Sequence, residues 1–122
     1  MFRGEGAVEE VEFIANLANE FDLAYLHVMR ANFFGAQKGD VVTPARKTFK
    51  NALIVNMGYE AEEAEKGVTD GDYDAVAFGT KWLANPDLDK RFKLGKSLND
   101  PKPEHFYTKV AEEYTDYPYL EE

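Results

Sequence analysis

The sequence predicts an α/β fold in which three parallel strands are joined by helices, and three observations lead to this prediction. Short, nearly continuous apolar runs begin at residues 23, 52 and 75. A helical pattern lies between successive runs, and the runs begin roughly 20 to 30 residues apart, the length of a parallel crossover. An eight-stranded α/β barrel takes about 250 residues. This chain of 122 residues is therefore either a small open α/β sheet or about the last third of a barrel.

The N-terminal part is predicted to form a helix, a strand and a short second helix. Apolar residues recur at spacings of three and four over residues 7–21, as in an amphipathic helix. Residues 23–28 are nearly all apolar, as in a strand that is covered on both faces. A loop over residues 30–42 leads to the second helix. Thr43 is its candidate N-cap, with Pro44 at the first helical position.

The central part contains the other two apolar runs, which predict strands over residues 52–56 and 75–79. A helix is expected between them over about residues 60–68. Acidic residues fill the first turn of this helix, where the helix dipole favours negative charge. The predicted order is therefore helix, strand, helix, strand, helix and strand, followed by one more helix.

That last helix is predicted from its end signals. Asn85 is its candidate N-cap, Pro86 opens it, and Gly95 ends it. The remaining residues contain several prolines and no long periodic pattern. We expect an ordered but mostly irregular tail with a short helix over about residues 104–113.

The composition narrows the possible functions. Apolar residues make up 44% and charged residues 30%, as in an ordinary soluble globular protein. Without cysteine, the chain has no disulfide, thiolate zinc site or cysteine nucleophile. The net charge of −9 disfavours nucleic acid as a partner. Neither a membrane span of about 20 apolar residues nor an apolar signal core is found, so we expect a cytoplasmic location and no membrane partner.

A similar pattern of residues follows the second and third predicted strands. Met57-Gly58 comes directly after the second run, and Gly79-Thr80 ends the third. Small residues at such turns let backbone N–H groups approach an anion, and a helix N-terminus adds positive potential. In α/β barrels, the loops after strands seven and eight form a recurrent phosphate site. The alternative is that both glycines only make tight turns from strand to helix.

Several segments also match a known family in their order along the chain. They are residues 23–28 (LAYLHV), 56–59 (NMGY) with the Glu-rich helix after them, 74–79 (DAVAFG), 83–88 (LANPDL), and the tail segments 97–99 (SLN), 106–107 (FY) and 114–118 (YTDYP). With these segments the chain resembles the old yellow enzymes, which are FMN-dependent NAD(P)H ene-reductases. The resemblance covers nearly the whole chain from about residue 7.

This resemblance implies the C-terminal portion of a TIM (β/α)8 barrel, about strands six to eight and the tail. Residues 1–122 would form one partial FMN-binding domain. In the family, NAD(P)H reduces FMN, and the flavin passes hydride to the β-carbon of an α,β-unsaturated carbonyl compound, an enone. This chain would supply the part that holds the FMN phosphate. It is expected to be inactive alone, because the family's catalytic residues precede the segment.

The resemblance also assigns site residues. Met57, Gly58, Gly79 and Thr80 would surround the FMN phosphate, mostly through main-chain N–H groups. Tyr107 matches an aromatic residue of the family's tail near the flavin and the substrate. The family usually has arginine where Thr80 stands, and Met57 replaces a common glycine. Both differences affect the expected tightness of phosphate binding. No catalytic residue and no metal ligand are assigned in this chain.

Two other interpretations stay open from the sequence. In the first, the chain is a non-enzymatic truncated fragment. It would form a homo-oligomer or complement an N-terminal barrel fragment, because open strand edges favour such pairing. Alternatively, it is an unrelated phosphate-binding α/β domain. His27 lies within a predicted strand and does not match the family's substrate-binding histidine, so we interpret it as structural.

Overall fold

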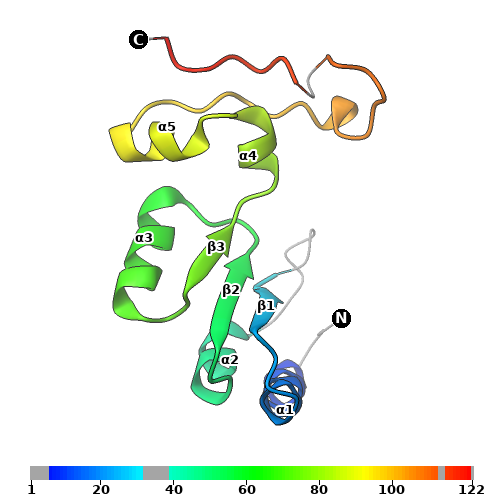
Figure 1. The fold of residues 1–122 in the computed structure, drawn as a ribbon, viewed down its shortest axis with the longest axis vertical. Coiled ribbons are helices and arrows are strands. Elements are labelled where there is room, and N and C mark those ends of the chain that lie inside the picture. Colours follow the sequence, from blue (N-terminus) through cyan, green and yellow to red (C-terminus); the bar gives the residue numbers. More distant parts are fainter. Residues whose placement is uncertain (1–5, 32–38, 113–114, 122) are drawn as a thin grey trace. The chain divides into compact units, whose positions relative to one another are not determined.

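Three parallel strands form one sheet in the computed structural model of the protein (Figure 1). The structure describes residues 6–31, 39–112 and 115–121. The strands lie side by side in chain order: β1 (Tyr25–Met29), β2 (Ala52–Asn56) and β3 (Ala75–Ala77). Asn56 at the end of β2 is the register partner of both Met29 and Ala77, so the three strands end at the same level. The predicted parallel strands are thus confirmed.

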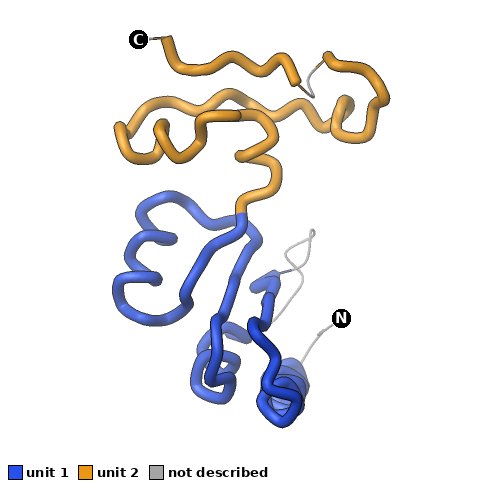
Figure 2. Tube along the Cα trace, in the orientation of Figure 1, with its two compact units in different colours: residues 1–77 blue, residues 78–122 orange. Residues whose placement is uncertain are grey.

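The chain divides into two units, residues 1–77 and 78–122, and each is described by itself (Figure 2). The first unit contains the sheet and three helices: α1 (Ala7–Glu20), α2 (Val42–Thr48) and α3 (Ala61–Asp70). Helix α2 packs against α1 and β2, while α3 packs against β3. Large buried side chains lie where α2 leads into the sheet: Val41, Phe49, Leu53 and Val55.

The junction between α1 and β1 shows why the first strand starts later than predicted. Asp22 adopts a positive φ of 48°, and the Leu23 N–H donates to the Ala18 carbonyl at 3.0 Å. Leu23 therefore completes the end of α1, and strand pairing begins at Tyr25. Asn19 links α1 to the end of α2, because its side chain donates to the Thr48 carbonyl at 2.7 Å.

The start of α2 differs from the prediction that Thr43 is its N-cap. The helix begins at Val42, two residues before the predicted first helical position, and the Asp40 carboxylate accepts the backbone N–H groups of Val42 and Thr43 at 2.9 and 3.1 Å. An acidic side chain satisfies these otherwise unpaired N–H groups well at a helix start. Pro44 lies inside the first turn, where its missing N–H costs no hydrogen bond.

The second unit contains two short helices, α4 (Thr80–Ala84) and α5 (Leu88–Leu94), and the 3-10 turn η1 (Pro103–His105). The prediction that Asn85 caps the last helix is wrong, because Asn85 directly follows α4, and Asp87 precedes α5. The predicted end is confirmed, since Gly95 adopts a left-handed conformation with φ 62°. The helix expected over residues 104–113 is reduced to η1 within the described part of that range.

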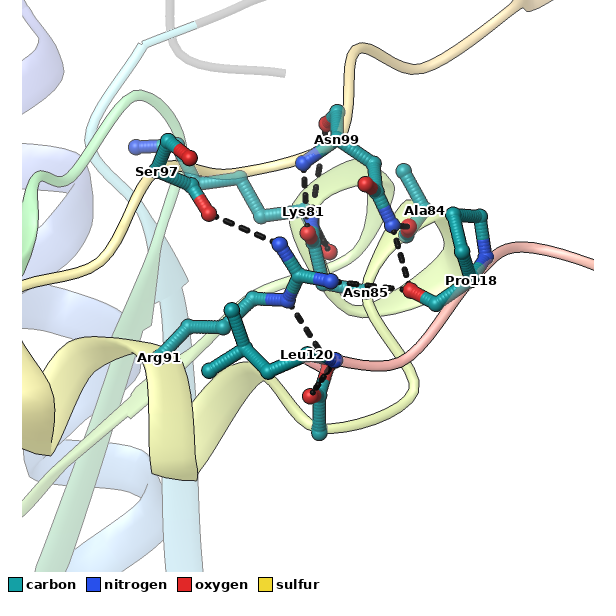
Figure 3. A network of polar contacts seen from close by, with 9 residues as sticks. Lys81, Ala84, Asn85, Arg91, Ser97, Asn99, Pro118 and Leu120 are labelled. Carbon is teal, nitrogen blue, oxygen red and sulfur yellow. Dashed lines mark hydrogen bonds and ion pairs between the residues drawn. The ribbon is translucent and has the colours of Figure 1, made fainter. Parts of the chain in front are cut away.

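A polar network holds the C-terminal tail against α4 and α5 (Figure 3). Arg91 forms a buried ion pair with Asp87 at 2.7 Å and also donates to the Ser97 and Pro118 carbonyls. The Asn99 side chain donates to the carbonyls of Ala84 and Pro118. Side chains from α5 and from the tail itself thus fix the tail within the second unit.

Among the described residues, none of the helices combines the length and the apolar character that crossing a membrane requires.

Candidate functional site

The loop between β2 and α3 has an unusual backbone conformation. Met57 and Gly58 both have positive φ, at 90° and 71°. Glycine adopts such angles readily, but a residue with a Cβ is strained there by about 1–3 kcal/mol. The contacts that surround Met57 must offset this strain.

Arg30 supplies these contacts from the end of β1. Its backbone N–H donates to the Asn56 carbonyl at 3.2 Å, which fixes Arg30 beside the end of β2. Its Nε then donates to the Met57 carbonyl at 2.8 Å, and its Nη2 donates to the Gly58 carbonyl at 2.7 Å. Both carbonyl groups of the loop therefore point at one guanidinium group.

This arrangement determines where the loop's amides point. The described residues contain no cis peptide bond. In a trans peptide, the carbonyl and the following N–H point in opposite directions. Because the Met57 and Gly58 carbonyls face Arg30, the N–H groups of Gly58 and Tyr59 face away from it. Gly58 is exposed, so the loop can be reached from solvent at this residue.

Glu63 and Tyr59 hold the Arg30 side chain in place. Glu63 lies in the first turn of α3 and forms an ion pair with Arg30 through both of its oxygens. The guanidinium carbon lies 3.7 Å from the centre of the Tyr59 ring, a cation–π contact. Tyr59 in turn packs edge-to-face against Tyr73, with ring centres 5.5 Å apart.

The charges of this cluster are fixed at neutral pH. The hydrogen bonds from Arg30 lower the pKa of the Glu63 carboxyl, and Glu63 raises the pKa of the Arg30 guanidinium. Burial raises the pKa of the Tyr59 hydroxyl to about 12, which outweighs the opposing effect of Arg30. Arg30 and Glu63 are therefore ionised, while Tyr59 is neutral.

Gly79 and Thr80 lie near the start of the second unit. Gly79 has φ −88°, which any residue can adopt, and a Cβ built there meets nothing within 4 Å. Neither its backbone angles nor its neighbours therefore require a glycine. The alternative was that both glycines only make tight turns from strand to helix. The positive φ of Gly58 supports this alternative, whereas the backbone angles of Gly79 do not require a glycine. Thr80 is exposed at the first position of α4.

The structure brings only some of the predicted site residues together. Met57 and Gly58 share one loop in the first unit. Gly79 and Thr80 are adjacent in the second unit, where Tyr107 is 97% exposed in the tail. Among the described residues, no group of His, Cys, Asp or Glu side chains is arranged to hold a metal ion.

Arg30 is the residue of this site that the sequence analysis missed. The sequence offers one signal, a cation placed directly after an apolar strand, at the same strand end as Met57. That signal indicates a position at the sheet edge but not a partner. The two carbonyls that Arg30 contacts are 27 and 28 residues away in the chain.

Comparisons with known proteins agree with the resemblance seen in the sequence. No family model matches the chain. The chain is 44% identical to a Leishmania infantum protein named "probable flavin mononucleotide-dependent alkene reductase", over 88% of this chain and 29% of that protein. It is 38% identical to a 12-oxophytodienoate reductase-like protein of Solanum lycopersicum, over 89% of this chain and 30% of that protein. The chain thus spans about three tenths of these relatives.

Solved structures give the same result. The old yellow enzyme from Trypanosoma cruzi matches 98% of this chain and 33% of its own, with a TM-score of 0.91 and 36% sequence identity. Morphinone reductase in complex with tetrahydroNAD matches 96% of this chain and 31% of its own, with a TM-score of 0.83 and 36% identity. The chain therefore belongs to the old yellow enzyme family and corresponds to the C-terminal portion of its TIM barrel.

Proposed function

We propose that this chain supplies the FMN-phosphate part of an NAD(P)H-dependent ene-reductase that acts on α,β-unsaturated carbonyl compounds. Main-chain N–H groups of the Met57-Gly58 loop would hold the phosphate. Gly79 and Thr80, which follow β3 in the chain, would also bind the phosphate, and Tyr107 would lie near the flavin and the substrate. We expect the chain alone to be inactive, because the family resemblance assigns no catalytic residue to it.

The observation that carries this proposal is the orientation of the Met57-Gly58 loop. Arg30 binds both loop carbonyls, so the amide of the exposed Gly58 faces away from it as a hydrogen-bond donor. Such donors suit a phosphate, which only accepts hydrogen bonds when fully ionised. The open space at Gly79 also suits a ligand, since no atom within 4 Å of its Cβ position would be displaced.

FMN, when bound, supplies the hydride-transfer chemistry between NAD(P)H and the activated C=C bond. The residues of this chain would bind and orient the phosphate end of that cofactor. Thr80 provides one hydroxyl donor and no positive charge. We therefore expect the isolated chain to purify colourless and to bind FMN only weakly.

A chimeric barrel tests the proposal. The chain would replace the matching C-terminal portion of morphinone reductase, and bound flavin would be measured by visible absorption. We expect a yellow protein, and we expect Gly79→Val to abolish the colour by blocking close approach of the phosphate.

Gly6→Val is the matched control for this substitution. Gly6 also precedes a helix, has φ −90°, and has nothing within 4 Å of its Cβ position. The control should stay yellow. Undiminished FMN binding by the Gly79→Val chimera would contradict the assignment of Gly79 to the site.

A second candidate function is association through the first unit, and exposed apolar side chains at α1 favour it. Phe13 lies within this helix and Phe21 directly follows it, and they are 68% and 70% exposed. The edge strand β1 lies next along the chain, where Tyr25 is 58% exposed. Such apolar surface usually marks an interface. We propose an N-terminal barrel segment as its partner.

Light scattering of the isolated chain tests this candidate. With no such segment present, we expect self-association through the same surface, and Phe13→Lys with Phe21→Lys should suppress it. An N-terminal barrel segment should also convert the aggregates into a defined complex. A stable monomer at high concentration that does not bind this segment would exclude the candidate.

A further inference from the structure

We propose that Arg30 is the positioning residue of the Met57-Gly58 loop, and that it acts through the loop's carbonyl groups and not as a phosphate ligand. This inference rests on the proposed function only for the identity of the ligand, the phosphate of FMN. The claim about the loop concerns contacts within this chain and is tested without a ligand.

The hydrogen bonds of Arg30 support a role within the chain. A guanidinium group has five N–H donors. Arg30 makes four donations: Nε to the Met57 carbonyl, Nη2 to the Gly58 carbonyl, and one from each Nη to Glu63. One face of the group also lies over the Tyr59 ring. With its donors and charge engaged in this way, Arg30 acts on a ligand through the loop that it holds.

The contacts reach every part of the turn from strand to helix. Arg30 is fixed to β2 by its backbone, to the loop by two carbonyls, and to α3 by Glu63. A change at Arg30 therefore releases the strained Met57 conformation and the orientation of the two amides together. A lysine cannot replace it, because a single ammonium group lacks the planar fork that reaches both carbonyls and both carboxylate oxygens.

The chain offers a matched control in Arg46. Its Nη2 donates to the carbonyls of Phe49 and Asn51, and its Nη1 forms an ion pair with Asp74. Arg46 thus binds two carbonyls and one carboxylate, as Arg30 does, but at a different turn. Arg46→Lys should perturb the structure to a similar degree without releasing the Met57-Gly58 loop.

The experiment compares Arg30→Lys with Arg46→Lys in the full chain by nitrogen relaxation and by titration with inorganic phosphate. In the unmodified chain and in Arg46→Lys, we expect backbone order parameters near about 0.85 at Gly58 and Tyr59. In Arg30→Lys they should fall below about 0.6. The phosphate concentration that half-shifts the Gly58 amide signal should rise at least about tenfold.

The outcomes separate this inference from the proposed function. A loosened loop in Arg30→Lys supports the inference even if the unmodified chain does not bind phosphate, a result that would count against the proposed function alone. An ordered loop in Arg30→Lys overturns the inference. Weaker phosphate binding with an unchanged loop also overturns it, because Arg30 would then be a direct ligand.

A further measurement needs no substitution at Arg30 and applies even if Arg30→Lys does not fold. The Arg30 Nε–H is bonded to the Met57 carbonyl in the structure. Its exchange with solvent should therefore be slowed at least about tenfold relative to an exposed arginine. Glu63→Gln keeps both carbonyl bonds and should keep this protection. Rapid Nε–H exchange in the unmodified chain would refute the positioning role.

Discussion

Thr80 occupies a position at which a small change in side chain should have a large effect on binding. Its hydroxyl offers one donor, whereas the arginine that is usual in the family offers a charged fork for a phosphate. Its side chain is exposed at the start of α4, so a larger residue fits there without displacing the core. Binding strength can therefore be changed at Thr80 without changing the fold.

Thr80→Arg should strengthen FMN binding in the chimeric barrel about tenfold or more. A hydrogen bond to a charged group contributes about 1.5–3 kcal/mol, and each 1.4 kcal/mol corresponds to about tenfold in affinity. FMN titration followed by flavin fluorescence measures the change. Thr80→Gln, which adds length but no charge, is the control and should gain much less. Equal affinities for the threonine and arginine forms would count against placing residue 80 at the phosphate.

Single residues also show which parts of the site can be predicted from the sequence. Gly58 is visible as a turn residue because the left-handed region favours glycine. Met57 is a methionine in that region, and nothing local predicts it. Its conformation depends on Arg30, whose hydrogen bonds join residues far apart in the chain, so residue patterns alone do not reveal the pair.

At the scale of elements, one glycine fits α3 against Tyr73, which lies two residues before β3. A Cβ at Gly67 would lie 2.0 Å from the end of the Tyr73 ring. The ring cannot move away easily, because its hydroxyl donates to the Glu63 carbonyl at 2.9 Å and its edge contacts Tyr59. Gly67 therefore allows α3 to approach close enough to support the Met57-Gly58 loop.

Gly67→Ala should destabilise the chain by about 1–3 kcal/mol, as overpacking usually does. Helix propensity alone predicts the opposite, a gain of about 1 kcal/mol. Urea unfolding decides between the two effects. In a Tyr73→Val background, Gly67→Ala should cost much less than it does in the unmodified chain, because the ring that the new methyl group meets is absent. A more stable Gly67→Ala single variant would mean that α3 is not held against Tyr73.

The tail of the second unit depends on the Asp87–Arg91 pair. Burial of Asp87 opposes its ionisation, but the Leu120 N–H at 2.7 Å and the Arg91 guanidinium outweigh it and lower the pKa of the carboxyl. A carboxyl whose pKa is lowered by folding stabilises the folded state above its unfolded pKa. This contribution is lost as the pH falls through the lower folded value.

We therefore expect the Leu120 amide signal to titrate with a midpoint below 3.8, the ordinary pKa of aspartate. Nuclear magnetic resonance across the acid range measures this midpoint. Asp87→Asn should remove the titration and weaken tail protection already at neutral pH. A midpoint at or above the ordinary value would show that the ion pair does not hold the tail.

Element boundaries illustrate what the sequence alone cannot determine. Thr43 and Asn85 have the right residue types for N-caps, but Asp40 and Asp87 precede the helices instead. Each helix start has several polar residues nearby, and residue type alone does not distinguish between them. Tertiary contacts decide between them: Asn85, for example, accepts the Asn99 N–H at 2.7 Å.

At the scale of the whole chain, the architecture was largely predictable. Buried parallel strands need continuous apolar runs, and three such runs marked β1, β2 and β3. Helix α4 was missed, because its five residues are too short for a periodic pattern. The choice between an open sheet and part of a barrel came from family motifs and not from periodicity, since both folds use the same local units.

In the proposed function, the Met57-Gly58 loop binds the phosphate of FMN. The most direct test is a titration of the full chain with FMN and, separately, with riboflavin, which lacks the phosphate, followed by proton–nitrogen correlation spectra. We predict that FMN shifts the Gly58 amide signal, while riboflavin at the same concentration leaves it in place. Equal shifts with both compounds, or no shift with FMN, would contradict it.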